Sequence, residues 1–281
     1  MNYKLVAFDC DGTFLDSNGN IPQRNKDIIH KLYNMGIEII AVTGRSDILT
    51  KDYIEELGIN IPVIGCNGAT LSDVITDNRM YVKPVPKKAV KAVLSLCIDE
   101  GIPCKMFSVD TCFSSDREML EKGIKQIVTK YTRELKYMVN SKWLSDEDML
   151  RLADTEDIIK LVVVDNDIEK LMQMQIRFNE IEGLQVFKSN VNCLDMIGDN
   201  VSKGNALTEF AKNKKIPMEK CVAFGDSEND ISMLQAAGLG IAMENADEAV
   251  RLSADRVTLT NDECGVAYEL EKIFSTGGYN G

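Results

Sequence analysis

The stretch KLVAFDCDGTFLDS, from Lys4 to Ser17, decides the fold of this chain. Its residues Leu5 to Phe8 are apolar without interruption, which is typical of a strand buried on both faces of a parallel sheet. Two aspartates, Asp9 and Asp11, follow directly. Because carboxylates are costly to bury without a partner, the pattern predicts a strand that delivers two charges to a site.

Two later segments repeat this design. IEIIAV, residues 37–42, is followed by Thr43, and CVAF, residues 221–224, is followed after one glycine by Asp226. Segments with helical periodicity separate the three strands, so the chain predicts right-handed crossovers and a Rossmann-like, doubly wound parallel sheet of the α/β class. Ligands bind such sheets at the carboxyl ends of the strands, where these polar groups are expected to meet.

A second domain is expected inside the first. The segment KPVPKK contains two prolines that suit a linker, and beyond it the pattern changes to a helix, a hairpin in PCKMFSVDTCFSS, and further helices and strands. We therefore predict a first domain from residues 1–83 and 190–281 and an inserted α+β domain over 84–189. The chain is expected to return to the first domain through NCLDMIG, residues 192–198.

Composition excludes several classes of partner. The 281 residues include 44 acidic and 32 basic side chains, a formal charge of −12 that would repel nucleic acid or an anionic membrane. The eight cysteines form no C-x-x-C pair, which favours reduced thiols, and no apolar run is long enough to span a bilayer, so we expect a cytoplasmic protein. No pattern indicates an oligomeric state.

Carboxylates must also carry any acid–base chemistry, since the one histidine, His30, excludes a histidine triad. Asp9, Asp11 and Asp226 offer the hard oxygen ligands that Mg²⁺ prefers, although an acidic pair before glycine also describes an ordinary turn. A metal beside a nucleophilic carboxylate is the apparatus of phosphoryl transfer, with Asp9 as nucleophile and Asp11 as acid and base.

The phosphate oxygens in such a reaction need donors. Thr43 lies at the second strand end, and Lys203 in NVSKGNAL enters a predicted helix whose N-terminus favours anions. Taken separately, Thr43 with Gly44 also describes a simple turn, and Lys203 a solvated surface lysine.

Four segments in this order carry a family resemblance: DCDGT, TGR, the distant Lys203 and GDSEND. They resemble the four motifs of the haloacid dehalogenase (HAD) superfamily. GCNGA at residues 65–69, NVSKG at 200–204 and the insertion after the second motif resemble its Cof-type phosphatases. Those enzymes carry a large α/β cap, so the resemblance implies that the inserted domain is such a cap.

The resemblance also implies roles for the acidic residues. Asp9 resembles the nucleophile that becomes phosphorylated and a ligand of Mg²⁺. Asp11 resembles the acid/base, with its backbone carbonyl also on the metal, and Asp226 resembles the remaining protein ligand.

Further positions follow from the same motifs. Thr43 and Lys203 resemble the phosphate-binding pair, with Gly44 lending its backbone N–H. The supporting positions are Asn229 beside the phosphate, Asp230 near Lys203 or a metal-bound water, and Asn67 in the loop near the site.

The sequence therefore predicts a Mg²⁺-dependent phosphatase that hydrolyses a small phosphorylated metabolite through an aspartyl-phosphate. Sugar phosphates are the leading class by resemblance, and the cap is expected to close and set specificity through residues 107–113, 165–167 and 188–190. One alternative is a phosphomutase with the same nucleophile, although mutases of this superfamily usually carry a small helical cap. Another is a non-catalytic regulator that binds a phosphorylated metabolite.

Overall fold

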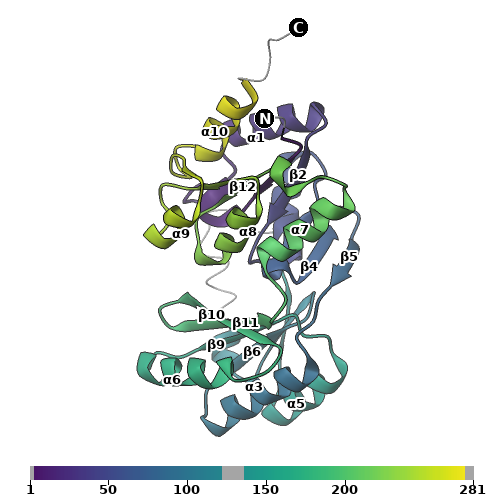
Figure 1. Cartoon of the computed structure of the whole chain (residues 1–281). Helices are drawn as coiled ribbons and strands as arrows, with labels where there is room; N and C mark the ends of the chain where they lie inside the picture. Colours follow the sequence, from purple (N-terminus) through teal and green to yellow (C-terminus); the bar gives the residue numbers. More distant parts are fainter. Residues whose placement is uncertain (1–2, 122–135, 276–281) are drawn as a thin grey trace. The chain divides into compact units, whose positions relative to one another are not determined.

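The structure, a computed structural model, describes residues 3–121 and 136–275. The described residues divide into two compact units (Figure 1). The first unit comprises the chain up to Met80 and from Ser202 onward, and the second comprises most of the chain from Tyr81 to Val201. Each unit has its own cluster of buried apolar side chains, so each has the core of an independent domain.

An eight-stranded sheet forms the centre of the first unit. Its strands lie in the order β14 (Arg256–Val257), β13 (Leu239–Ala242), β12 (Cys221–Gly225), β1 (Leu5–Phe8), β2 (Glu38–Val42), β3 (Val63–Gly65), β4 (Thr70–Asp73) and β5 (Asn78–Val82). The strands from β14 to β3 pair in parallel, and β4 runs antiparallel to β3. The three predicted strands β1, β2 and β12 are neighbours in the middle, which confirms the expected parallel sheet.

Helices cover both faces of this sheet. They are α1 (Gln23–Asn34), α2 (Lys51–Leu57), α7 (Lys203–Asn213), α8 (Ile231–Ala236), α9 (Glu248–Ser253) and α10 (Gly265–Ser275). Val6 and Phe8 of β1 pack in one apolar cluster with side chains of α1, α2 and α10. Leu5 and Ala7 point to the other face and are also fully buried, as strand alternation requires when both faces are covered.

A six-stranded sheet forms the second unit. Its order is β10 (Leu184–Asn190), β11 (Cys193–Gly198), β9 (Lys160–Val164), β6 (Cys104–Phe107), β7 (Thr111–Ser114) and β8 (Asn140–Trp143). Helices α3 (Lys87–Asp99), α5 (Asp146–Thr155) and α6 (Ile168–Asn179) supply most of the other side chains in its apolar cluster. The hairpin expected in PCKMFSVDTCFSS is present as β6 and β7, and the α+β character of the insertion is confirmed.

The expected boundary at residue 190 is too early. β11 was expected to lead back into the first domain, but it pairs antiparallel with both β9 and β10. Its Leu194 and Met196 lie in the apolar cluster of the second unit. The division follows Met80 at one end and Val201 at the other, because the apolar face of this strand is buried by the second unit.

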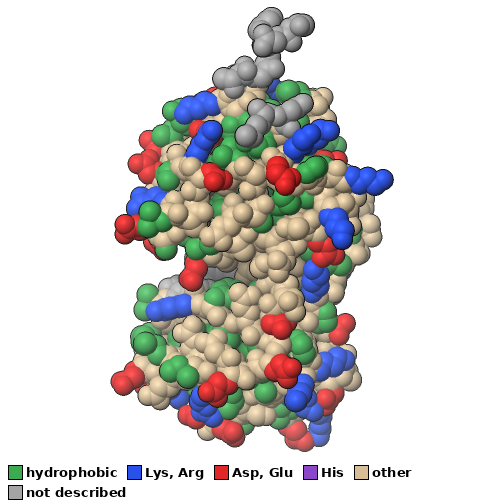
Figure 2. Space-filling view, viewed as in Figure 1, with side chains coloured by type: hydrophobic (Ala, Val, Ile, Leu, Met, Phe, Trp, Pro, Cys, Tyr) green, Lys and Arg blue, Asp and Glu red, His purple; other side chains and the backbone are tan. Residues whose placement is uncertain are grey.

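Two expectations from composition can be compared with the structure. None of the eight cysteines, all of which lie in the described ranges, forms a disulfide. Within residues 3–121 and 136–275, no helix has the length and apolar content needed to cross a membrane. On the face drawn in Figure 2, acidic and basic side chains are interspersed.

Candidate active site

Three of the predicted site residues lie at the ends of neighbouring strands. Asp9 follows β1, Thr43 follows β2 and Asp226 follows β12, and β1 pairs with both of the other strands. Each strand therefore presents its next polar residue at the same edge of the sheet, as expected of parallel strands in an α/β fold.

Lys203 lies at the centre of this group. Its side chain is 1% exposed, and its Nζ donates to Asp9 Oδ1 at 2.6 Å and to Asp230 Oδ1 at 2.6 Å. Ser202 caps helix α7 by accepting from Asn205 N, so Lys203 enters the site from the first turn of the helix. The alternative of a solvated surface lysine is excluded by this burial.

Opposite charges determine the ionisation of this lysine. Burial disfavours the ammonium, but the carboxylates of Asp230 and Asp9 outweigh burial and hold the pKa of Lys203 above its ordinary value. Burial is also the main cause that raises the pKa of Asp9, and Lys203 opposes it.

Asp230 shapes the loop that carries Asp226. Its Oδ2 accepts from the backbone N–H groups of Asp226 and Ser227, at 3.0 Å each, while its Oδ1 accepts from Lys203. Gly225 is required next to it, because a Cβ at that position would overlap the Asp230 side chain. Asp230 therefore supports both Lys203 and the backbone of the acidic loop.

Three carboxylates gather closely enough to share a cation. One oxygen from each of Asp9, Asp226 and Asp230 lies within 4.8 Å of the others. Burial, followed by the charge of Asp230, raises the pKa of Asp226 to about 6. With Lys203 as their counter-charge, the three carboxylates retain an excess of negative charge, and hard oxygen donors of this kind fit a divalent cation.

The loop after Asp9 is built around Asp226. Thr13 Oγ1 donates to Asp226 Oδ1 at 2.7 Å, and Gly12 has a φ of +76° with its Cα against the Asp226 carboxylate. A Cβ at Gly12 would overlap that carboxylate, so glycine is required for both conformation and space. Asn245 Nδ2 donates to the Gly12 carbonyl at 2.8 Å and holds the loop from the other side.

Asp11 points to an arginine that was not predicted as a site residue. Arg45 Nε and Nη2 donate to the two carboxylate oxygens of Asp11, at 2.5 Å each. Among the residues that the structure describes, the carboxylate cluster consists of Asp9, Asp226 and Asp230, and it does not include Asp11. The side chain of Asp11 and those of Asp9 and Asp226 therefore have different surroundings, which suits different roles.

The second strand end meets the GCNGA loop. Asn67 N donates to Thr43 O at 3.0 Å, and Asn229 Nδ2 donates to Asn67 Oδ1 at 2.9 Å. A Cβ at Gly44 would lie 2.9 Å from Asn67 Oδ1, so glycine lets the two asparagines approach the strand end. Because Thr43 Oγ1 already accepts from Arg45 N at 3.1 Å, its hydroxyl proton remains available for donation.

The structure thus brings together all nine predicted site residues, and three others join them. These three are Thr13, Arg45 and Asn245. Thr13 and Arg45 lie inside motifs that were recognised, DCDGT and TGR, whereas Asn245 carries no sequence signal.

Two of the expected specificity residues in the second unit stabilise the start of α6. Asp167 caps α6 by accepting from Lys170 N, and Asp165 Oδ1 accepts from Asp167 N. The side chains of residues 189 and 190 lie outside the described set.

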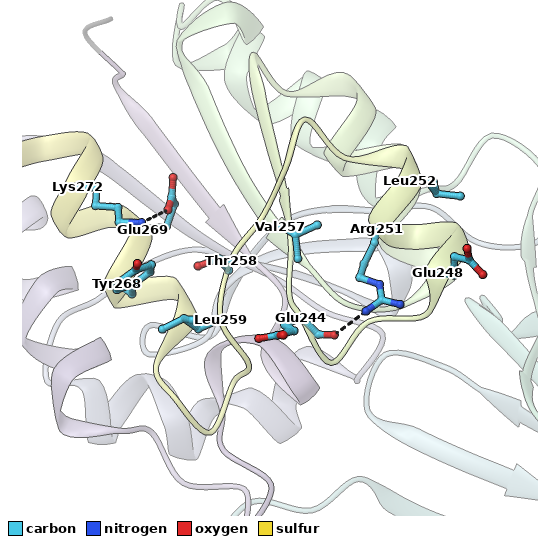
Figure 3. A pocket seen from close by; sticks show the side chains of 10 residues that line it. All are labelled: Glu244, Glu248, Arg251, Leu252, Val257, Thr258, Leu259, Tyr268, Glu269 and Lys272. Carbon is cyan, nitrogen blue, oxygen red and sulfur yellow. Dashed lines mark hydrogen bonds and ion pairs between the residues drawn. The ribbon is translucent and has the colours of Figure 1, made fainter.

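An open groove lies elsewhere on the first unit, between α9, β14 and α10 (Figure 3). Arg251 donates to Glu244 O across one end, and Lys272 pairs with Glu269 at the other. None of the predicted site residues lines this groove, so it is separate from the carboxylate cluster.

Comparison with known proteins identifies the family. The sequence model of the haloacid dehalogenase-like hydrolase family matches residues 6–270. Phosphatase YwpJ of Bacillus subtilis is 32% identical, over 96% of this chain and 99% of its own length. In the same organism, the 5-amino-6-(5-phospho-D-ribitylamino)uracil phosphatase YwtE is 29% identical, over 97% of this chain and 98% of its own length.

A solved structure agrees with these relatives. The HAD subclass IIB sugar phosphatase BT4131 superposes with a TM-score of 0.79 at 25% identity, covering 97% of this chain and 99% of that one. The likeness extends over both units. The chain therefore belongs to the haloacid dehalogenase-like hydrolases, and among them to the Cof-type phosphatases.

Proposed function

We propose that this phosphatase hydrolyses a small phosphate monoester with Mg²⁺ through an aspartyl-phosphate on Asp9. The carboxylates of Asp9, Asp226 and Asp230 gathered around buried Lys203 support this proposal. In it, the first unit is the catalytic core and the second unit is the cap.

The first half of the reaction transfers the phosphoryl group to the enzyme. An Asp9 carboxylate oxygen attacks phosphorus, and the bond from phosphorus to the leaving oxygen breaks. The protonated carboxyl of Asp11 gives its proton to that oxygen, so the product leaves as an alcohol. Lys203, the Thr43 hydroxyl and the Gly44 N–H bind the phosphoryl oxygens, with Asn229 beside them.

The second half releases phosphate. A water oxygen attacks phosphorus while the Asp11 carboxylate takes the water proton, and the bond from phosphorus to Asp9 breaks. Asp9 and Asp11 are thereby restored to their starting states, and one water is consumed for each phosphate and alcohol formed.

A divalent cation fits the acidic side of this site. Asp9, Asp226 and the backbone carbonyl of Asp11 would hold it, and Asp230 would support the loop behind Asp226. When bound, Mg²⁺ supplies positive charge that offsets the charge of the phosphoryl group.

Sugar phosphates are the proposed substrate class. BT4131 is named a sugar phosphatase, and YwtE is named for a substrate that carries a phosphorylated ribityl chain, which supports this class. We also propose a cytoplasmic setting, supported by eight cysteines that form no disulfide in the described chain.

Phosphate release from a panel of compounds tests the function. The panel contains sugar phosphates, nucleotides, pyridoxal phosphate and an aryl phosphate, each with Mg²⁺ and with chelator. We expect multiple turnovers that need Mg²⁺, with sugar phosphates favoured. Isomerised product without phosphate release would indicate a phosphomutase, and tight binding of these compounds without turnover would indicate a regulator.

Proton competition is expected to weaken Mg²⁺ binding at low pH. Burial and then Asp230 raise the pKa of Asp226 from its ordinary 3.8 to about 6, so the metal-free protein still holds this proton below about pH 6. Because a carboxyl must be ionised to bind a metal, the apparent Kd should rise at least about fivefold between about pH 6 and about pH 5. Titration calorimetry in two buffers measures both Kd and proton release, and a Kd that is constant over this range would contradict the expectation.

A further inference from the structure

Arg45 holds the Asp11 carboxyl with two hydrogen bonds at once. Its Nε donates to Asp11 Oδ2 and its Nη2 to Oδ1, at 2.5 Å each. We propose that Arg45 is a positioning residue, which orients this carboxyl for proton transfer to the leaving oxygen and from the attacking water. The inference rests on the proposed function, because it assigns a partner to the acid/base of that reaction.

The carboxyl of Asp11 needs such a partner. Its side chain is 34% exposed and follows a strand end, in a loop where Gly12 has positive φ. Proton transfer requires the donor within hydrogen-bond reach of the reacting oxygen, so rotation about the side-chain bonds would reduce the reactive fraction. A planar guanidinium that contacts both oxygens restricts the position and the rotation of the carboxyl together.

Arg45 is itself held before any substrate binds. Its side chain is 13% exposed, its Nη1 donates to Tyr53 Oη at 3.2 Å, and its Cζ lies 5.2 Å from the centre of the Tyr53 ring. Tyr53 is 3% exposed and belongs to the main apolar cluster of the first unit. The arginine is thus anchored to the core at one end of its guanidinium and to Asp11 at the other.

The backbone of Arg45 is fixed as well. Its N–H donates to Thr43 Oγ1 at 3.1 Å, and its carbonyl accepts from Cys66 N at 2.7 Å. The same residue therefore connects the phosphate-binding threonine, the GCNGA loop and the acid/base. This connection lets Arg45 place Asp11 at a set position relative to the bound phosphoryl group.

In the proposed reaction, Asp11 takes the water proton in the second half and gives it to the leaving oxygen of the next turnover. Arg45 contacts each Asp11 oxygen through one N–H, so its planar fork fixes both oxygens at once. Lysine cannot reproduce this, because its ammonium is a point charge without a planar pair of donors.

Leaving groups of different basicity separate positioning from other roles. A 4-nitrophenolate leaves without a proton, whereas a sugar alkoxide needs one. For each substrate we measure the single-turnover rate of leaving-group release: the sugar from a sugar phosphate, and 4-nitrophenolate from 4-nitrophenyl phosphate. In Arg45→Met, we expect the first rate to fall at least about tenfold more than the second. Arg45→Lys should recover only part of the difference.

The chain offers a matched control. Arg24 pairs with Glu271 through the same two-bond geometry, at 3.0 and 2.6 Å, on an exposed surface. Arg24→Met should leave both rates unchanged. In an Asp11→Asn background, Arg45→Met should add no further selective loss, because a residue that acts through Asp11 has nothing left to orient.

The outcomes decide between roles. Two results would overturn the proposal and make Arg45 a phosphate or substrate ligand. One is that Arg45→Met slows the release of both leaving groups equally. The other is that, in the Asp11→Asn background, Arg45→Met still causes the full additional loss with the sugar phosphate. Wild-type enzyme that releases phosphate from none of the monoesters would instead reject the proposed function, before any Arg45 variant is compared.

Discussion

Asp9→Asn is expected to abolish turnover, with a loss of at least about 10⁴-fold in phosphate release. The amide is a poor nucleophile and cannot form the aspartyl-phosphate, while its size and shape match the carboxylate. The wild-type carboxylate lies directly after β1, within the carboxylate cluster and 2.6 Å from Lys203 Nζ.

This variant should keep its fold. Burial is the largest cause that raises the pKa of Asp9, so the ionised group is disfavoured by its surroundings even with Lys203 beside it. Removing the charge leaves Lys203 paired with Asp230. We therefore expect the metal-free variant to unfold at a temperature no lower than wild type, by thermal denaturation with chelator present.

An aspartate between β14 and α10 provides the control. Asp262 accepts from Ser17, at the end of the DCDGTFLDS segment, but it is exposed and outside the carboxylate cluster. Asp262→Asn should retain wild-type turnover. Phosphate release by Asp9→Asn within a few-fold of wild type, measured on the best compound of the panel, would contradict the covalent mechanism.

The strand ends could be predicted because the physics there is local. An uninterrupted apolar run requires burial on both faces, and the polar residue that ends it must then lie at the sheet edge. This placed Asp9, Thr43 and Asp226 correctly. Lys203, nearly 200 positions away from Asp9 in the chain, was a candidate from its place at a predicted helix start, but its local sequence left a solvated surface lysine open. Only the resemblance gave it a partner role in the site.

The partners of the predicted residues could not be read from the sequence. Arg45 faces Asp11 because two neighbouring strands end side by side, and Asn245 reaches the Gly12 carbonyl from a loop after β13. Both contacts depend on the positions of separate elements in three dimensions. The misplaced boundary at 190 has the same origin, because a strand such as Cys193–Gly198 has the same apolar pattern in either sheet.

Lys203→Met is expected to destabilise the metal-free protein by about 3–5 kcal/mol, the cost of breaking a buried ion pair. The ammonium lies between Asp9 and Asp230, both nearly inaccessible to water, at 2.6 Å from each. Methionine fills a similar volume but leaves the two carboxylates without their counter-charge. Phosphate release should also be lost, since the phosphoryl group loses its main cationic donor.

The loss of stability should depend on pH. Without Lys203, the pKa of Asp9 rises further above its ordinary value, because the charge that opposed burial is gone. A carboxyl whose pKa is raised by folding stabilises the folded state when protonated, and this stability is lost as the pH rises through the folded pKa. The deficit relative to wild type should therefore be larger at about pH 8 than at about pH 5, in urea denaturation with chelator.

A compensating substitution separates stability from activity. Lys203→Met combined with Asp230→Asn removes one of the two uncompensated charges, while the amide oxygen can still accept from the backbone at Asp226 and Ser227. The double variant should regain much of the stability and none of the activity.

A lysine at the end of the same helix provides the control. Lys214→Met removes an exposed ion pair with Glu38 and should change the stability little. If Lys203→Met were instead as stable as wild type at both pH values, the ammonium would not be needed to stabilise the buried carboxylates of Asp9 and Asp230. The role of Lys203 would then be limited to binding the phosphate.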